Sequence, residues 1–389
     1  MIYLDNAAST PIDKDVFNEM LPFLVEQYGN PSSIHKLGRN ANKAIQNARK
    51  QTASLINAQA DEIFFTSGGT ESNNIALYGF AHTKKGNHII TSSIEHEAIL
   101  EPCKRLEKDG FLVTYLPVSS DGLVDPLDVK NAITKDTCLV SIMFANNEIG
   151  TVQPIKEILK ICKEKQIQFH SDAVQAVGKT QIDIKDLDLS AMSISSHKLN
   201  GPKGIGALYI KKGTKIEPFI LGGGQENGIR SGTENVASIV GFGKACDLAK
   251  ENLQKNIVHL KSLRDSLVSK ITGEISHVSF NGHKEKRIPN NAHFTFLGVN
   301  GEDLIIKLDE NGIAASTGSA CSVKTQKASH VLKAMGFSHE QITGSLRLTV
   351  GLSNTFEEID TTVAILKKVV KELREVSPFK VKYVSELKF

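Results

Sequence analysis

The sequence predicts an α/β protein whose mostly parallel central sheet is accompanied by a smaller α+β domain. Helical and strand-like segments alternate up to about residue 210, which is typical of a parallel sheet. After the glycines at 222–224 the pattern changes to long charged helices and few strands. A chain of 389 residues is long enough for two domains. We expect a large domain over 14–254 and a small domain formed by 1–13 and 255–389.

Short runs rich in branched and aromatic residues, bounded by polar or glycine-containing segments, predict the strands. In the large domain they are at 88–91, 111–117, 138–144, 167–170, 189–194 and 205–210. Apolar residues at helical spacing predict the intervening helices at 39–57, 73–83 and 154–165. One long helix over 238–272 is expected to bridge the two domains. It precedes strands at 293–296 and 346–350 and a last helix at 356–376.

The composition excludes several classes of function. Hydrophobic residues make up 40% and charged residues 23% of the chain, as in an ordinary globular protein. The net charge is only +3 and the lysines are interleaved with acids, so we expect no direct contact with nucleic acid. No apolar run approaches the length of a membrane span, and the first residues do not resemble a secretion signal. We therefore expect no association with a membrane.

The five cysteines are scattered and form no Cys-x-x-Cys pair, so we expect no metal site within the chain. An odd number without a secretion signal predicts a reducing compartment, the cytoplasm. Four of them have apolar or helical neighbours and are interpreted as buried small residues or helix-surface residues. Cys321 differs, because glycine and small residues at 316–325 indicate an exposed loop. It is either a nucleophile, ionised with the help of Lys324, or an incidental thiol.

Chemically active side chains follow four of the predicted strands. Ligands of open α/β sheets bind beyond the carboxyl ends of the strands, so these side chains are expected to meet. The strand ends are 92–96, 145–148, 171–175 and 195–198. A capped turn explains any one of them equally well, and Lys198 alone could be an ordinary solvated lysine. Together they favour a site in which Lys198 is an amine held for Schiff-base chemistry.

The segment SGGTESN at 67–73 follows a short apolar run and opens a helix. Its glycines permit close backbone approach, and a helix N-terminus attracts an anion, so a phosphate would fit. The alternative is a tight turn with Thr70 as the N-cap. The spacing matches neither a nucleotide P-loop nor a dinucleotide fingerprint.

Pyridoxal phosphate (PLP) is the cofactor that would use all of these groups, because it carries a phosphate, an aldehyde and a ring nitrogen. Asp172 would keep the ring nitrogen protonated, His96 would stack on the ring, and Gln175 would donate to the ring oxygen. The aldehyde would bond to Lys198. The groups expected at the phosphate are Gly69, Thr70, Ser195 and His197.

Seven motifs, in the same order, resemble the cysteine desulfurases of the NifS and IscS type. These enzymes belong to the class V aminotransferase family and to fold type I of the PLP-dependent transferases. The motifs are GNPSS (29–33), TSGGTESN (66–73), EH (95–96), ANNEIG (145–150), HSDAVQ (170–175), SHK (196–198) and RSGTEN (230–235). The resemblance extends over essentially the whole chain, and the loop around Cys321 is similar to that of group I desulfurases.

The resemblance implies that the chain removes sulfur from L-cysteine to give L-alanine and a persulfide on Cys321. It implies that Lys198 is the Schiff-base lysine and that His96 carries a proton. Thr233 would reach the phosphate in the other subunit of a homodimer. The acceptor would be an iron–sulfur scaffold or a tRNA-thiolation enzyme. Residues 379–389 lack the motif by which some members engage a scaffold, so the acceptor stays open.

Arg347 has two interpretations. Polar and apolar residues alternate over 345–350, and this periodicity alone favours an arginine on the solvated face of a half-buried strand. The resemblance implies instead that Arg347 binds the α-carboxylate of the substrate with its bidentate fork, assisted by Asn147. Three alternatives for the whole chain are a selenocysteine lyase, an aminotransferase of the same class, and a scaffold without PLP that only docks sulfur acceptors.

Overall fold

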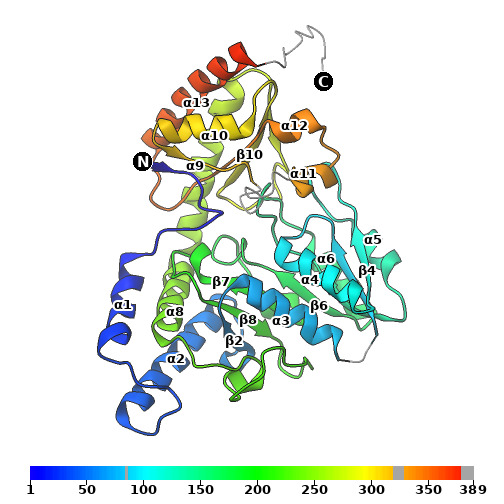
Figure 1. Cartoon of the computed structure of the whole chain (residues 1–389), viewed down its shortest axis with the longest axis vertical. Helices are drawn as coiled ribbons and strands as arrows, with labels where there is room; N and C mark the ends of the chain where they lie inside the picture. The colour runs from blue at the N-terminus through cyan, green and yellow to red at the C-terminus, as the bar shows by residue number, and fades with distance from the viewer. Residues whose placement is uncertain (84–85, 319–327, 378–389) are drawn as a thin grey trace.

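The computed structural model describes residues 1–83, 86–318 and 328–377. A seven-stranded sheet forms the centre of the larger part, with the strand order β2-β8-β7-β6-β5-β3-β4 (Figure 1). Neighbouring strands are parallel, except that β8 runs antiparallel to β7 and to β2. The strands are β2 (Ile63–Thr66), β3 (His88–Ser92), β4 (Leu112–Leu116), β5 (Thr137–Ser141), β6 (Gln168–Asp172), β7 (Ala191–Ser195) and β8 (Gly206–Ile210). The predicted parallel sheet is confirmed.

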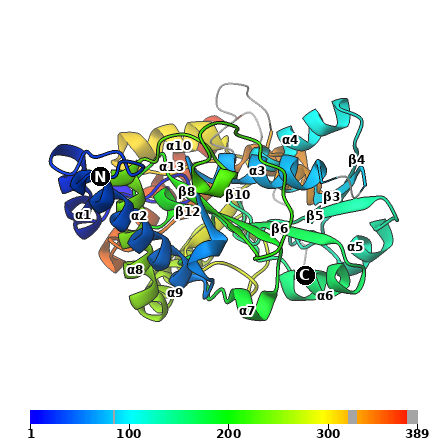
Figure 2. The same cartoon turned by 90° about the horizontal axis from the view of Figure 1, so that it is seen from below.

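Helices cover both faces of this sheet, so that all of its strands except the edge strand β4 are largely buried on both sides (Figure 2). On one face, α3 (Gly69–Ala81) and α4 (Glu97–Lys108) pack on a core that includes Ile75, Phe80 and Leu106. The helices of the other face share a core with Ile45 and Phe242. They are α2 (Lys36–Leu55), α5 (Pro126–Ala132), α6 (Ile155–Glu164), α7 (Ile184–Leu187) and α8 (Val236–Glu251). Helix α1 (Lys14–Val25) lies against α8.

A second, antiparallel sheet with the order β12-β10-β9 has a core of its own, which includes Phe294, Leu348 and Leu366. Helices α9 (Leu253–Glu274), α10 and α13 pack on it in the upper part of Figure 1. The elements are β9 (Val278–Asn281), β10 (Asn291–Phe296), α10 (Gly301–Glu310), α11 (His330–Ala334), α12 (His339–Thr343), β12 (Ser345–Thr349) and α13 (Phe356–Val376). The chain starts here too, because β1 (Ile2–Tyr3) pairs with β11 (Ile313–Ala314). The exact domain limits stay a prediction.

The single helix expected over 238–272 is wrong in one respect, because it is divided into α8 and α9 (Leu253–Glu274) at Asn252. The side-chain amide of Asn252 donates to the carbonyl oxygen of Leu248 at 3.0 Å, a local bond that competes with the backbone ladder. The break lets α8 pack on the first core and α9 on the second. None of the described helices is long and apolar enough to cross a membrane.

Candidate active site

The carboxyl ends of β2, β3, β5, β6 and β7 meet at one edge of the large sheet, next to a cavity of about 430 Å³. Parallel strands place their ends together in this way, which is why the sequence could predict the meeting point. Most of the predicted site residues line this cavity. They are Gly69, Thr70, His96, Asn147, Asp172, Gln175, Ser195, His197, Lys198 and Arg347. Thr233 is exposed outside the cavity, and Cys321 lies outside the described residues.

The start of α3 forms one end of the cavity and offers a place for a phosphate. Its N-cap is Gly68, at φ 152°, which brings no side chain to the free N–H groups of the first turn. The alternative with Thr70 as the N-cap is therefore wrong. A Cβ on Gly69 would lie 2.7 Å from Cγ2 of Val174, so this position needs glycine. His197 stands opposite as a neutral donor or acceptor, since burial and the charge of Lys198 lower its pKa to about 4.

Asp172 is held at the end of β6 by two hydrogen bonds. The amide of Asn73 donates to Oδ2 at 2.7 Å, and the backbone N–H of Val174 donates to Oδ1 at 3.0 Å. The carboxylate is buried and faces the cavity, so it could pair with a protonated ring nitrogen. We did not single out Asn73 from the sequence. Its place one helical turn after Gly69, in the same motif, was the available signal.

Lys198 follows β7 in a short 3₁₀ turn (Ser196–Lys198). Its Nζ donates to the carbonyl oxygens of Ala7 and Ala8, at 2.6 and 2.7 Å. The amide of Gln175 donates to the same oxygen of Ala7 at 3.0 Å. The amino-terminal segment thus completes the wall around Lys198, although nothing in its sequence pattern indicated this contact.

His96 is the N-cap of α4, because Nδ1 of its ring accepts the backbone N–H of Ala98 at 3.0 Å. Burial lowers the pKa of His96, so the ring is neutral near pH 7 and carries its hydrogen on Nε2. Beneath it, the fully buried Glu95 accepts hydrogen bonds from Ser92 Oγ at 2.6 Å and from the backbone of Met143 at 2.9 Å. Desolvation raises the pKa of Glu95 to about 8, so this carboxyl is mostly protonated at neutral pH.

Arg347 enters the cavity from β12 and is only 2% exposed, so the interpretation as a solvated arginine is wrong. Both faces of β12 are buried, since the face of Arg347 is covered by other segments. Nη2 pairs with Asp5 at 2.8 Å, and Nη1 donates to the carbonyl oxygens of Asn147 at 3.0 Å and Gly318 at 3.2 Å. Its Nε is buried and has no hydrogen-bond partner among the described residues.

Three buried polar atoms in this lining lack a partner in the described part of the chain: Asn73 Oδ1, Gln175 Oε1 and Arg347 Nε. Buried polar atoms rarely lack a hydrogen-bond partner, and the occurrence of three such atoms in one cavity indicates a polar ligand. A pyridine ring with phosphate and hydroxyl groups, together with an amino-acid substrate, fits this set of donors and acceptors. Among the described residues no group of three His, Cys, Asp or Glu side chains could hold a metal ion.

Fold and cavity together define a PLP-dependent enzyme of fold type I. The family model of the class-V aminotransferases matches residues 2–362. "Cysteine desulfurase IscS" of Dictyoglomus turgidum is 52% identical over 381 residues, which cover 97% of each chain. The structure of a "NIFS-LIKE PROTEIN" superposes with a TM-score of 0.90 at 39% identity, over 95% of this chain and 99% of that one. "SspA in complex with cysteine" has a TM-score of 0.80 at 38% identity, over 90% and 99%.

The chain therefore belongs to the class-V aminotransferase family and, within it, to the cysteine desulfurases of the IscS and NifS type. Enzymes of this family depend on PLP, so PLP is the cofactor that the cavity serves.

Proposed function

We propose that the chain is a PLP-dependent cysteine desulfurase, which converts L-cysteine to L-alanine and leaves the sulfur as a persulfide on Cys321. The observation that carries this proposal is the cavity itself, in which Asp172, Lys198 and Arg347 lie together. The 52% identity to curated desulfurases over 97% of the chain supports the same reaction.

Different residues of the cavity would bind different parts of the cofactor. Asp172, oriented by Asn73, would pair with the ring nitrogen, and Lys198 would bond to the aldehyde. Gly69, Thr70, Ser195 and His197 would hold the phosphate at the start of α3. The amide of Gln175 would face the ring oxygen while one of its N–H groups stays on Ala7. When bound, PLP accepts the electron pair that remains on Cα after proton removal.

Lys198 would be the base that removes the Cα proton of the substrate. The ammonium formed on Nζ finds acceptors in the carbonyl oxygens of Ala7 and Ala8, to which this nitrogen already donates. These oxygens keep the side chain in place between the two proton transfers. The Nε2–H of the neutral His96 ring would donate a proton to the product, and the Nε2 left bare by that transfer would then take up the proton of the next substrate thiol.

Arg347 binds the α-carboxylate of L-cysteine. Its Nε is a buried donor without a partner among the described residues, so a carboxylate there would satisfy it and gain a charge-assisted hydrogen bond. The partners on Nη1 and Nη2 fix the plane of the guanidinium. Asn147, which also lines the cavity, is the neighbouring group that would assist.

Cys321 attacks the substrate sulfur as a thiolate. The C–S bond of the substrate breaks, an S–S bond forms on Cys321, and the carbon skeleton leaves as L-alanine after it regains two protons. The sulfur then passes to an acceptor, either an iron–sulfur scaffold or a tRNA-thiolation enzyme. The reducing cytoplasm is the proposed compartment, and the buried thiols Cys103, Cys138, Cys162 and Cys246 are compatible with it.

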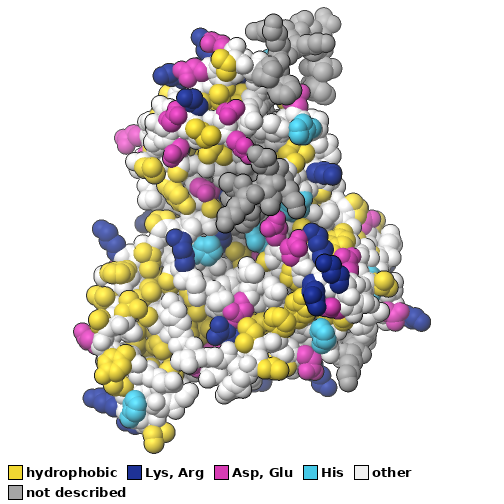
Figure 3. All heavy atoms as spheres, viewed as in Figure 1, with side chains coloured by type: hydrophobic (Ala, Val, Ile, Leu, Met, Phe, Trp, Pro, Cys, Tyr) yellow, Lys and Arg dark blue, Asp and Glu magenta, His cyan; other side chains and the backbone are white. Residues whose placement is uncertain are grey.

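A homodimer is the proposed assembly. Hydrophobic side chains gather over α1 and the turn after it, in the lower left of Figure 3. Among them Val25, Tyr28 and Ile34 are 66%, 75% and 90% exposed. An ion pair of 2.7 Å between Arg230 and Glu71 ties the loop of Thr233 to α3. A second copy would cover the apolar side chains and receive Thr233 at its phosphate.

The Cys321→Ala variant tests the function. It is expected to keep the absorbance of bound PLP, because the residues that hold the cofactor are intact. It should lose the release of L-alanine from L-cysteine, because the thiol that attacks the substrate sulfur is missing. Cys246→Ala, at a buried thiol far along α8, is the control and should react as the wild type does. Normal alanine release by Cys321→Ala would contradict the assignment, and 3-mercaptopyruvate, the keto acid of L-cysteine, as the product would favour an aminotransferase.

A further inference from the structure

Lys179 is a buried lysine that the proposed mechanism does not use. It is 6% exposed, and its Nζ makes one long hydrogen bond, 3.4 Å, to the carbonyl oxygen of Gln175. Among the described residues no carboxylate forms an ion pair with it. An ammonium group buried without a paired carboxylate is strongly unfavourable, so its position calls for a functional explanation.

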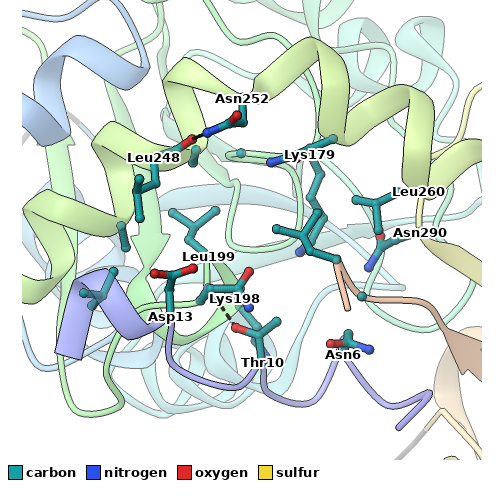
Figure 4. A pocket seen from close by; sticks show the side chains of 18 of the residues that line it. Asn6, Thr10, Asp13, Lys179, Lys198, Leu199, Leu248, Asn252, Leu260 and Asn290 are labelled. Carbon is teal, nitrogen blue, oxygen red and sulfur yellow. Dashed lines mark hydrogen bonds between the residues drawn. The ribbon is translucent and has the colours of Figure 1, made fainter. Parts of the chain in front are cut away.

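Lys179 and Lys198 line the same second cavity, of about 230 Å³, which is separate from the first except that Lys198 lines both (Figure 4). The wall from α8 and α9, with Leu248, Asn252 and Leu260, contains no charged side chain. The acids of this lining are Asp13 and Asp15 at the exposed start of α1, where Asp13 accepts the backbone N–H of Asp15 at 2.8 Å. The cavity therefore reaches the surface near these acids.

A short chain of contacts joins the two amines. Lys179 donates to the backbone oxygen of Gln175, the side chain of Gln175 donates to the oxygen of Ala7 at 3.0 Å, and Lys198 donates to that same oxygen at 2.6 Å. Burial, followed by the positive charge of Lys198, lowers the pKa of Lys179 to about 7. His197 is the other titratable neighbour, and its pKa is lowered by burial, then by Lys198 and then by Lys179.

We propose that Lys179 and Lys198 form a coupled pair that holds one proton between them. Lys179 carries this proton while Lys198 is a neutral base, and its charge opposes protonation of Lys198 by solvent. When the Cα–H bond of the substrate breaks and an N–H bond forms on Lys198, Lys179 releases its proton to solvent through the second cavity. Lys179 is thus a positioning residue for the base, and the inference rests on the proposed role of Lys198.

The test uses the holoenzyme and the exchange of the Cα hydrogen of L-alanine for deuterium, measured by NMR across a pH series. Lys179→Met keeps the length of the side chain and removes the charge. Lys198 should then be protonated more easily, so the acid limb of the exchange-rate profile should move to higher pH by about one unit. At a fixed pH on this limb the exchange rate should fall about tenfold. Lys203→Met, at an exposed lysine, should leave the profile unchanged. Superimposable profiles for Lys179→Met and wild type would overturn the coupling.

Thermal unfolding across pH gives a second measurement, independent of turnover. The pKa of Lys179 is about 7 in the folded chain and about 10.4 in a model peptide, so the unfolded chain binds more protons between these values. The destabilisation by Lys179 is full below pH 7 and is lost as the pH rises toward 10. The gain in midpoint temperature of Lys179→Met over wild type should shrink over this range.

A constant gain over this range would show that Lys179 does not titrate there and would overturn the proposal. Lys179→Gln serves the same comparison if the methionine variant does not fold. Absence of any exchange in the wild type would instead contradict the proposed role of Lys198, so the two failures are distinguishable.

Discussion

Two walls of the active-site cavity are built on different principles. The wall around Asp172, Ser195 and Lys198 consists of the ends of adjacent parallel strands, whose spacing the backbone ladder sets. The wall around Arg347 depends on contacts between segments far apart in the chain, with Asp5 on one side and Asn147 on the other. In the proposed function the first wall would hold the cofactor and the second the substrate. A substitution in each should therefore change a different kinetic quantity.

The largest effect is expected from Lys198→Ala in the cofactor wall. In the proposed mechanism this variant removes both the amine that bonds to the cofactor and the base, so turnover should fall by about ten-thousand-fold. The absorbance of PLP bound through an amine should also disappear. Turnover and cofactor absorbance are measured in one experiment with L-cysteine as the substrate. Lys203→Ala, at an exposed lysine of the same loop, is the matched control. Retention of the bound absorbance would show that another amine holds the cofactor.

Arg347→Lys tests the substrate wall and should have the next largest effect. A lysine keeps the charge but has no fork and no Nε in the same plane, so kcat/KM for L-cysteine should fall roughly 100-fold. Most of this loss is expected in KM, while the cofactor absorbance stays that of the wild type. Arg105→Lys, at an exposed arginine of α4, is the control. A loss confined to kcat would contradict a role in substrate binding.

Asn73→Leu is a second substitution in the cofactor wall and should have the smallest effect. It removes one charge-assisted hydrogen bond from Asp172 and leaves the backbone N–H of Val174 in place. The loss in kcat should be roughly tenfold, with little change in KM. The pH dependence of the cofactor absorbance should change as well, because Asp172 is less well oriented. An unchanged absorbance and rate would show that Val174 alone holds the carboxylate.

The same contrast explains how much could be predicted from the sequence. The strands and the residues at their ends were predictable, since hydrophobic runs mark parallel strands and their carboxyl ends share one edge. The burial of Arg347 was not predictable, because alternation along a strand cannot show what covers its polar face. That face is buried by Asp5, more than 300 positions away in the sequence.

The contacts of Lys198 with Ala7 and Ala8 and the bond from Asn73 to Asp172 were missed for a related reason. Backbone carbonyl groups carry no signal in the residue type, and an asparagine in the first turns of a helix is common. The division of the bridging helix at Asn252 was missed because α8 and α9 keep helical spacing on both sides of it. The helix is divided because its two halves pack on two separate cores, which the spacing does not show.

The most direct test of the account is a single turnover of the holoenzyme with a limiting amount of sulfur-labelled L-cysteine. The products are L-alanine in solution and the sulfur state of each cysteine peptide, read by mass spectrometry after alkylation. The account predicts one L-alanine for each substrate consumed and an equal amount of labelled persulfide on Cys321. Alanine formed without a persulfide on Cys321, or pyruvate in its place, would contradict it.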